Sequence, residues 1–212
     1  MDWTTYKKRF RREARKQDRS KEYIDTCLAY AKGLFDRNLP IVFDQRHLSK
    51  LVGYELVYLM AAANAPKKFY REFEIPKRSG GKRKIVEPLP SLKYIQRWIL
   101  DNILYRIEVS RYAKAFVPGM SIRANSRFHR RQPMVLSLDI KDFFPSTKAN
   151  KVYGLFISLG YSKPVSTLLT RLCCYKKSLP QGTPTSPALS NILARRIDAR
   201  LGGFAMKHGI RY

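Results

Sequence analysis

The sequence predicts an α+β fold, because helical periodicity dominates the chain and separate regions between the helices have the pattern of β-strands. The first region is "FYREFEI", residues 69–75, in which one set of alternate positions is Phe, Arg, Phe and Ile and the other is Tyr, Glu and Glu. The glycine turn "KRSGGKR" and the segment "KIVEP" follow it. This order is typical of a β-hairpin. The second region is the apolar run "MVLSLDI", residues 134–140, which predicts a single strand opened by Pro133.

Helices are predicted on both sides of the hairpin. Residues 1–40 are mostly helical and strongly basic at their start, and Pro40 ends them. Ser49 is the predicted N-cap of one apolar helix, "LVGYELVYLMAAAN". After the hairpin, residues 91–104 have an apolar stripe at helical spacing, made of Leu92, Ile95, Ile99 and Ile103.

The second half is also mainly helical. Residues 110–132 are expected to be a basic loop. A helix is predicted from Pro145–Ser146 to Gly160, and Ser162 suits the N-cap of the next one. Ser186–Pro187 begins a last helix that Gly202–Gly203 is expected to stop, and "KHGIRY" is expected to begin a strand.

The net charge is the strongest indication of a partner. The 212 residues include 42 Lys and Arg against 16 Asp and Glu, a formal charge of +26, while the hydrophobic fraction of 44% is that of a globular chain. Nucleic acid is the expected polyanion, since phosphate contacts favour Lys and Arg. An anionic membrane is the weaker alternative because the charge is spread along the chain. No membrane span is expected, since the longest apolar stretch is short and contains Glu55.

The cysteines indicate a compartment. Cys27, Cys173 and Cys174 are odd in number and lack metal-ligand spacing, which favours a reducing cytoplasm. The Cys173–Cys174 pair lies in an apolar helical pattern and is expected to serve packing alone.

Two carboxylates in this basic chain raise a chemical question. Asp139 ends the predicted strand and Asp142 follows three residues later, before two phenylalanines and a proline. A strand-end Asp commonly caps a turn or helix. In a groove that attracts phosphate, however, a carboxylate repels the substrate unless a divalent cation lies between them. Mg²⁺ prefers one or two carboxylates together with substrate phosphates, so metal-assisted phosphoryl chemistry is the alternative.

Two other segments suit phosphate or sugar recognition. The hairpin tip "KRSGGKR" presents cations that could close on a triphosphate, although a solvated turn explains them equally well. The loop "LPQGTPTSP" is stiffened by prolines and carries Gln181, whose amide both donates and accepts hydrogen bonds.

Taken together and in this order, the basic hairpin, the Asp-Phe-Phe-Pro-Ser segment and the Pro-Gln-Gly-Thr-Pro loop resemble the reverse transcriptases. The segment "FISLGYSKPVSTLLTRLCCYKKSLPQGTPTSP" and "NSRFH", residues 125–129, resemble the bacterial retron branch, with Ser126 replacing an Ala of its signature. The resemblance implies the fingers and partial palm of a right-hand polymerase, with a fingertip hairpin and an incomplete antiparallel palm sheet. It divides the chain into a basic helical extension (1–44), fingers (45–132) and partial palm (133–212).

The resemblance also implies roles around the metal and the sugar. Asp139 would bind both catalytic Mg²⁺ ions, with the Ile140 carbonyl as a further ligand. Asp142 would lie near the sugar and triphosphate of the incoming nucleotide. Phe143 and Phe144 would contact that nucleotide, and Phe144 would be the steric gate that favours dNTPs over ribonucleotides.

The remaining roles concern phosphates and RNA. Arg83 would stack over the base and contact phosphate, with Lys77 or Arg78 as its companion and Gln181 near the same nucleotide. The expected template or RNA contacts are Gly182, Asn125, His129, Lys82 and Lys84.

The implied activity is RNA-directed DNA synthesis on a structured RNA. The implied partners are the template and primer RNA, the RNA–DNA hybrid, dNTPs, two Mg²⁺ ions and a defence effector protein, in antiphage defence. The family's Tyr-x-Asp-Asp motif and thumb are missing from this sequence, so the chain alone is expected to be inactive. It is interpreted as a fragment, as one half of a split enzyme whose partner is a palm and thumb half, or as a degenerate paralogue. Another class of bacterial reverse transcriptase and a non-catalytic RNA-binding subunit stay open as alternatives.

Overall fold

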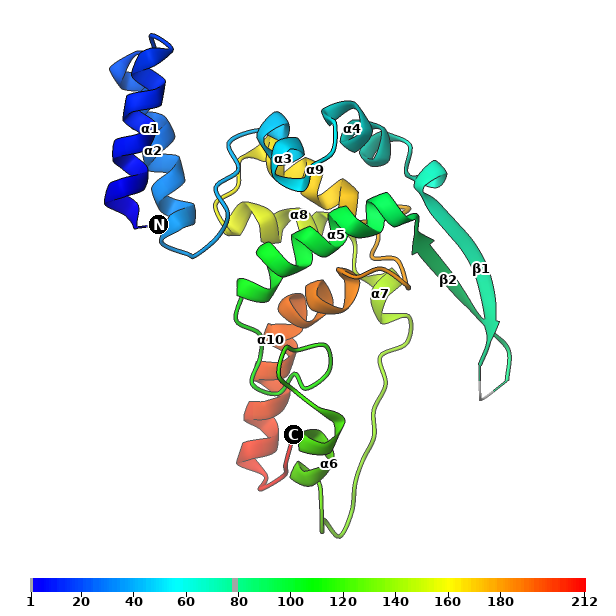
Figure 1. Ribbon diagram of the computed structural model, residues 1–212. Coiled ribbons are helices and arrows are strands. Elements are labelled where there is room, and N and C mark those ends of the chain that lie inside the picture. The colour runs from blue at the N-terminus through cyan, green and yellow to red at the C-terminus, as the bar shows by residue number, and fades with distance from the viewer. Residues whose placement is uncertain (1, 78–79) are drawn as a thin grey trace.

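Helices dominate the computed structural model, which describes residues 2–77 and 80–212 (Figure 1). Within these residues the strands form one two-stranded antiparallel sheet. The predicted α+β class is therefore confirmed.

The chain begins with two helices that lie side by side at one side of the molecule (Figure 1). They are α1 (Trp3–Lys16) and α2 (Lys21–Phe35), as predicted for this region. Each starts at a side-chain cap: Asp2 accepts a hydrogen bond from the Thr5 amide, and Ser20 accepts one from the Tyr23 amide.

The next region holds two helices where the sequence predicted one. They are α3 (Gln45–Val52) and α4 (Leu56–Asn64), separated by Gly53 at φ +73°. The prediction of Ser49 as an N-cap is wrong, because Asp44 caps α3 by accepting from the His47 amide at 2.7 Å. A glycine in the left-handed region ends α3, as it commonly ends helices.

The predicted hairpin is confirmed. After a short 3-10 helix, η1 (Pro66–Phe69), β1 (Tyr70–Pro76) pairs antiparallel with β2 (Lys82–Pro88). The register places Tyr70 opposite Pro88 and Pro76 opposite Lys82. The predicted amphipathic helix follows as α5 (Pro90–Asn102), and a 3-10 turn, η2 (Leu104–Arg106), completes this part.

The predicted strand over 134–140 is wrong. These residues are extended, but their backbone groups form no hydrogen bond with any part of the chain that the structure describes. Their side chains are exposed on both faces, with Met134 at 85% and Leu136 at 80% on one face and Val135 at 63% on the other. A β-strand requires a neighbour for its N–H and C=O groups, and within 2–77 and 80–212 this segment has none. The expected palm sheet is accordingly not formed.

Local helices replace two other expectations. The basic loop 110–132 contains α6 (Ile122–Phe128), capped by Ser121. The helix expected from Pro145 is divided into α7 (Phe143–Ser146) and α8 (Ala149–Ser158). The helix predicted after Ser162 is confirmed as α9 (Lys163–Cys173).

The last helix is longer than predicted. It is α10 (Ser186–Lys207), and it continues through Gly202 and Gly203. A side chain at Gly202 would overlap the ring of Tyr112, so this glycine allows a close approach rather than ending the helix. The expected strand at "KHGIRY" is wrong, since residues 208–212 are a turn and irregular chain.

One hydrophobic core joins most of these elements. It runs from Leu34 to Ile192 and includes fully buried side chains of α3, α5, α8 and α9, among them Leu48, Ile99, Phe156 and Leu169. The buried thiols of Cys173 and Cys174 belong to it, as expected for packing residues. Among the described helices, none combines the length and the apolar character that crossing a bilayer requires.

Candidate functional site

A cavity of about 780 Å³ lies where the hairpin faces the extended segment and the loop before α10. It gathers ten of the residues that the sequence assigned to a site. They are Lys77, Lys82, Arg83, Lys84, Asp139, Ile140, Asp142, Phe143, Phe144 and Gln181. Three motifs that lie far apart in the sequence therefore share one cavity. Arg78, the other predicted triphosphate contact, lies outside the residues that the structure describes.

The two carboxylates are exposed in this cavity. The backbone of Asp142 is left-handed, with φ +52° and ψ +38°, a region that few non-glycine residues adopt. This residue turns the chain from the extended segment into α7, and its carbonyl accepts from the Ser146 amide at 2.9 Å. Neither Asp139 nor Asp142 forms an ion pair or a side-chain hydrogen bond with another described residue. Both carboxylates are thus available to a ligand of the cavity.

Two aromatic rings border the carboxylates. The rings of Phe143 and Phe144 are 6.1 Å apart, and Phe144 is half-buried against the hydrophobic core. The Phe143 carbonyl accepts hydrogen bonds from Ser146 Oγ at 2.8 Å and from Thr147 Oγ1 at 3.1 Å. These hydrogen bonds fix the backbone of α7. The position of Phe144 is therefore restrained both by its backbone and by the packing of its ring against the core.

The cations of the hairpin are not equivalent. Lys82 pairs with Glu74 at 3.1 Å, and Lys84 pairs with Glu72. Arg83 lies directly across from Ile75 in the register, which places it on the other face of the hairpin from these lysines. Arg83 has no ion-pair partner among the described residues, so its guanidinium is the more available one for an anionic ligand.

Glu72 joins the hairpin to the loop after α9. Its carboxylate accepts from Tyr175 Oη at 2.5 Å and from Lys176 Nζ at 2.9 Å, in addition to Lys84. The Lys84 hydrogen bond, followed by those of Tyr175 and Lys176, lowers the pKa of Glu72 to about 2. This carboxylate therefore stays ionised and holds two cavity cations, Lys84 and Lys176, in place.

The same contact continues into the core. The rings of Tyr70 and Tyr175 are 4.8 Å apart, and Tyr70 Oη accepts from Gln96 Nε2 at 2.9 Å. Gln96 is fully buried and also donates to the Leu172 carbonyl at 2.8 Å. Burial raises the pKa of Tyr70 above its ordinary value. The root of the hairpin is thus fixed to α5 and α9.

Sequence reasoning missed Glu72 and Tyr175. The alternation of the hairpin contained a signal for the first, because the antiparallel register places Glu72 on the same face as Lys84. No signal in the sequence pointed to Tyr175.

Gln181 and Gly182 lie against the outer edge of β2. The Val86 amide donates to the Gln181 carbonyl at 2.7 Å, and Gln181 also lines the cavity. Gly182 does not line the cavity. Its φ is +118°, and a Cβ there would lie 2.9 Å from Ile85 Cγ2. A glycine is therefore needed at this position so that the loop can pack closely against the hairpin.

The structure does not bring Asn125 and His129 into the cavity. Asn125 is exposed on α6 and His129 follows that helix, with its ring 5.1 Å from that of Phe128. Figure 1 places α6 near the end of the chain, where Arg211 donates to the Phe128 carbonyl at 3.0 Å. Any role of these two residues lies outside the cavity that holds the carboxylates.

Asp139, Ile140 and Asp142 are the residues that the sequence suggested around a Mg²⁺ ion. All three residues line the larger cavity, and carboxylate and carbonyl oxygens are the hard ligands that Mg²⁺ prefers. Within 2–77 and 80–212, no three His, Cys, Asp or Glu side chains come together as a metal cluster. Mg²⁺ held here would therefore need further oxygen ligands, such as the phosphates of a substrate.

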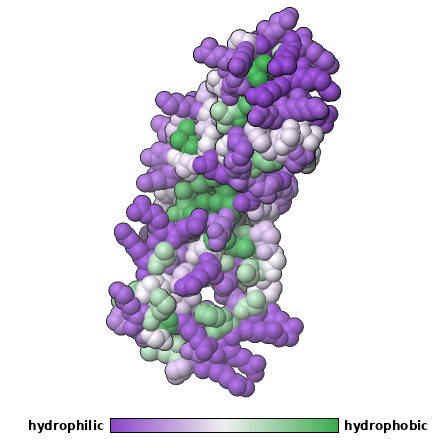
Figure 2. Space-filling model, turned by 90° about the vertical axis from the view of Figure 1, so that its left-hand side faces the viewer, coloured by the Kyte–Doolittle hydropathy of each residue, from purple (hydrophilic) through white to green (hydrophobic). Residues whose placement is uncertain are grey.

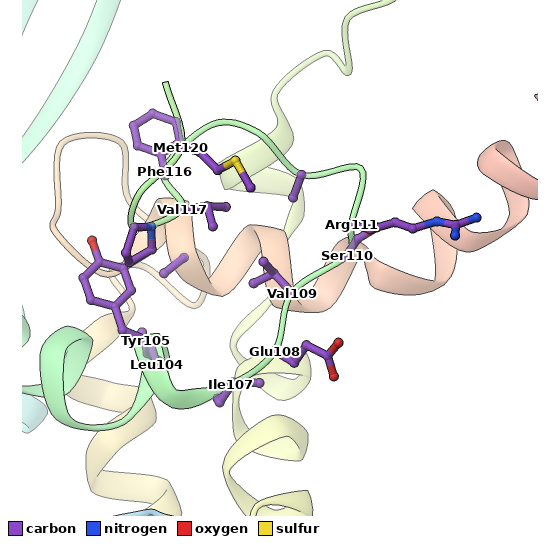
Figure 3. Close-up of a pocket in the computed structure, with 13 residues that line it drawn as sticks. Leu104, Tyr105, Ile107, Glu108, Val109, Ser110, Arg111, Phe116, Val117 and Met120 are labelled. Atoms are coloured by element: carbon purple, nitrogen blue, oxygen red, sulfur yellow. The ribbon is translucent and has the colours of Figure 1, made fainter. Parts of the chain in front are cut away.

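A second cavity, of about 380 Å³, has a different character. It lies between the loop 104–120 and the start of α10 and is lined mainly by apolar side chains (Figure 3). Val109, Val117 and Met120 gather over α10, whereas Arg111 extends away from them (Figure 3). None of the predicted site residues lines it.

Comparison with known proteins identifies relatives. No family model matches the sequence. The chain is 36% identical over 196 residues to the retron Ec86 reverse transcriptase of Escherichia coli, a match that covers 92% of this chain and 60% of that protein. It is 40% identical over 161 residues to the retron Mx65 reverse transcriptase of Myxococcus xanthus, which covers 68% of this chain and 38% of that protein.

The chain thus spans less than two thirds of the length of these relatives. A third match, to the retron Mx162 reverse transcriptase of Myxococcus xanthus, is 38% identical over 161 residues and covers 68% of this chain and 33% of that protein. The motifs that share the larger cavity are those on which the sequence resembles reverse transcriptases. Agreement between these motifs and several relatives of one kind shows that this chain belongs to the retron reverse transcriptases.

Proposed function

We propose that this chain forms the fingers and the first part of the palm of a retron-type RNA-directed DNA polymerase, which copies a structured non-coding RNA into DNA. The observation that carries the proposal is the larger cavity. It unites the fingertip hairpin, the Asp139–Phe144 segment and Gln181. Relatives named as retron reverse transcriptases support the same assignment.

Asp139 and the Ile140 carbonyl are the proposed Mg²⁺ ligands, and Asp142 faces the sugar and triphosphate. When bound, two Mg²⁺ ions supply Lewis-acid activation of the primer hydroxyl and neutralise the charge on the α-phosphate and the pyrophosphate. Asp139 and Asp142 fit this role because both are exposed to the cavity and neither is engaged by a described side chain.

The cations of the cavity are proposed to orient the triphosphate. Arg83 and Lys77 are available, because no described carboxylate pairs with them. Lys84 and Lys176 are held by Glu72 and add positive charge from fixed positions. Groups that are already oriented attract a phosphate without the cost of ordering them during the reaction.

Phe144 is proposed to select the sugar. Its ring lines the cavity two residues after Asp142, and packing against the core keeps it from moving away. A ribose 2′-hydroxyl in that space would meet the ring, whereas deoxyribose would not. The protein therefore prefers dNTPs.

The proposed reaction needs more than the carboxylates described above. The sequence of 212 residues contains no Asp-Asp pair, and a two-metal site holds its ions about 3.5–4 Å apart with ligands on both sides. We infer that a palm and thumb segment supplies the second carboxylate motif and that the 212 residues alone bind substrates without polymerising. A role in antiphage defence, with an effector protein, is part of the same proposal.

Primer extension tests the proposed function. The chain is assayed alone, and in one polypeptide with any palm and thumb sequence that its gene encodes, on an RNA template with dNTPs and Mg²⁺. We expect template-dependent DNA synthesis in the second form and about 10²–10³-fold less, or none, with Asp139→Asn. Lys151→Ala, a change at an exposed site of α8, is the matched control and should leave synthesis unchanged.

Two results would count against this function. Equal synthesis by the Asp139→Asn variant would remove the metal role of Asp139. RNA binding without any synthesis, in a polypeptide that contains the palm and thumb, would instead favour a non-catalytic RNA-binding subunit.

A further inference from the structure

Helix α1 has two faces of opposite chemistry. Seven of its fourteen residues are Lys or Arg, and one is acidic. Trp3, Tyr6 and Phe10 recur at helical spacing on one side and are half-buried. At 100° per residue, Lys8, Arg12 and Arg15 lie on the side opposite to these rings. Arg9 and Lys16 extend the cationic side.

The aromatic face holds α1 in a fixed position. The ring of Trp3 is 5.3 Å from that of Phe35, which ends α2. The ring of Phe10 is 5.5 Å from that of Phe43, and the Phe43 ring is 5.6 Å from that of His47 in α3. Arg11 pairs with Asp25 of α2 at 3.2 Å. The aromatic contacts and the ion pair thereby dock the helix, although none of its residues is fully buried.

The cationic face has few partners of its own. Glu13 accepts from Arg12 at 3.0 Å and from Lys16 at 3.3 Å. Lys8, Arg9 and Arg15 are exposed and form no ion pair with any residue in the described part of the chain. Like charges this close on a helix repel one another, so the bare face is stabilised when an anion covers it.

The geometry of α1 favours nucleic acid over a membrane as that anion. A helix that binds a bilayer surface must insert its apolar face among the lipid chains. The apolar face of α1 already packs against the rings of Phe35 and Phe43. Phosphates of a nucleic acid require only the cationic face, which remains open.

We propose that the cationic face of α1 is a binding site for the phosphate backbone of RNA, separate from the polymerase cavity. Figure 1 places α1 at one side of the molecule and the hairpin at the other. Figure 2 looks at that side, and its upper part is mostly hydrophilic, with a small hydrophobic patch among the hydrophilic residues. The choice of RNA as the polyanion rests on the proposed function. A structured RNA held in the cavity would also be held by α1 at a distance from the site of synthesis.

We expect RNA binding by α1 to show no preference for base sequence. Lys8 and Arg15 are seven residues apart, about 10 Å along the helix, so they would contact different phosphates of one strand or of two. Contacts of this kind fix position and add affinity without identifying bases. We therefore expect α1 to bind structured RNA by charge and shape.

Fluorescence anisotropy with a labelled RNA stem-loop tests the site, using the full 212-residue chain. The test variant changes Lys8, Arg9 and Arg15 to Ala, which breaks no ion pair of the described chain and keeps a good helix former at each position. The matched control changes Lys50, Lys151 and Lys163 to Ala, which removes the same charge from three sites on α3, α8 and α9. A third variant, with Lys8→Arg, Arg9→Lys and Arg15→Lys, keeps the charge of α1.

We expect the α1 variant to bind roughly tenfold or more weakly at low salt. The slope of log affinity against log salt should fall by about 2 to 3, close to 0.9 for each phosphate that α1 no longer neutralises. The control and the charge-conserving variant should retain most of the affinity and slope of the parent chain. Circular dichroism of the α1 variant should show unchanged helix content.

Two outcomes would overturn the site. Equal weakening by the α1 variant and the matched control would mean that net charge alone governs binding. If the α1 variant instead lost binding to phosphatidylserine-containing vesicles and bound RNA as the parent chain does, the cationic face would be assigned to a membrane. The experiment measures RNA binding and not DNA synthesis. RNA binding that depends on α1, in a protein that makes no DNA, would therefore support this site and contradict the proposed polymerase function.

Discussion

The backbone amide of Val86 in β2 donates a 2.7 Å hydrogen bond to the carbonyl of Gln181, and so attaches the loop before α10 to the outer edge of the hairpin of β1 and β2. The next residue, Gly182, lies so close to the hairpin that a Cβ would approach Ile85 Cγ2 to 2.9 Å and the Val86 carbonyl oxygen to 3.1 Å. Two motifs that are distant in the sequence are thus joined through backbone atoms.

The first prediction concerns this contact. Gly182→Ala should lower the free energy of unfolding by about 1–3 kcal/mol, because Ala is strained at φ +118° and its methyl group displaces Ile85. Urea denaturation measures the loss, and hydrogen exchange at the Val86 amide should become faster. Gly81→Ala is the matched control: its φ is +78°, but no atom lies within 4 Å of the added Cβ. An equal loss from both changes would show that backbone strain alone is responsible.

The second prediction concerns pH. Hydrogen bonds from Lys84, Tyr175 and Lys176 lower the pKa of Glu72 from its ordinary value of 4.5 to about 2. A depressed carboxylate pKa means that the stabilisation is complete above pH 4.5 and is lost as the pH falls from there through about 2. The difference in free energy of unfolding between the parent chain and Glu72→Gln should therefore shrink across this range.

The control for Glu72 lies on the same strand. Glu74 forms one ion pair, with Lys82 at 3.1 Å, and both side chains are mostly exposed. Glu74→Gln should change the pH dependence of unfolding less than Glu72→Gln does. A stability difference for Glu72→Gln that stays constant down to pH 2 would contradict the role given to the carboxylate.

The third prediction concerns the sugar. Phe144→Val in a polypeptide that carries the palm and thumb should raise incorporation of rNTPs relative to dNTPs by roughly tenfold or more, because a smaller side chain leaves room for the 2′-hydroxyl. The ratio of kcat/KM values measures this. Since Phe144 also packs against the core, using the ratio removes any loss of folded protein from the comparison. Phe143→Val should leave the ratio nearly unchanged, and an equal effect at both positions would refute Phe144 as the gate.

The fourth prediction compares neighbouring glycines of α10. Gly202→Ala should destabilise the protein by about 1–3 kcal/mol, because the new methyl group overlaps the ring of Tyr112. Gly203→Ala should stabilise it by up to about 1 kcal/mol, since no atom lies within 4 Å of its Cβ and Ala favours the helix. Thermal unfolding of the two variants distinguishes these effects. A shift in the same direction for both would show that the approach of Tyr112 is not important.

Much of the candidate site follows from short motifs. Residue types and their order point to the hairpin cations, the Asp139–Phe144 segment and Gln181, and all of them except Arg78, which lies outside the described residues, line one cavity. Asn125 and His129 rest on resemblance alone, and the fold places them elsewhere. Glu72 and Tyr175 could not be found in this way because their 2.5 Å hydrogen bond joins distant parts of the chain.

The sequence by itself determined the elements whose signals are local. The hairpin of β1 and β2 has its alternation and glycine turn, and α5 and α9 each have an early proline and an apolar stripe within a few residues. Only the tertiary structure decided what depends on a distant neighbour. Gly202 continues α10 where Tyr112 packs on it, and 134–140 is extended without becoming a strand. A helix closes its hydrogen bonds within itself, whereas a strand requires a partner, and that partner must come from another part of the fold.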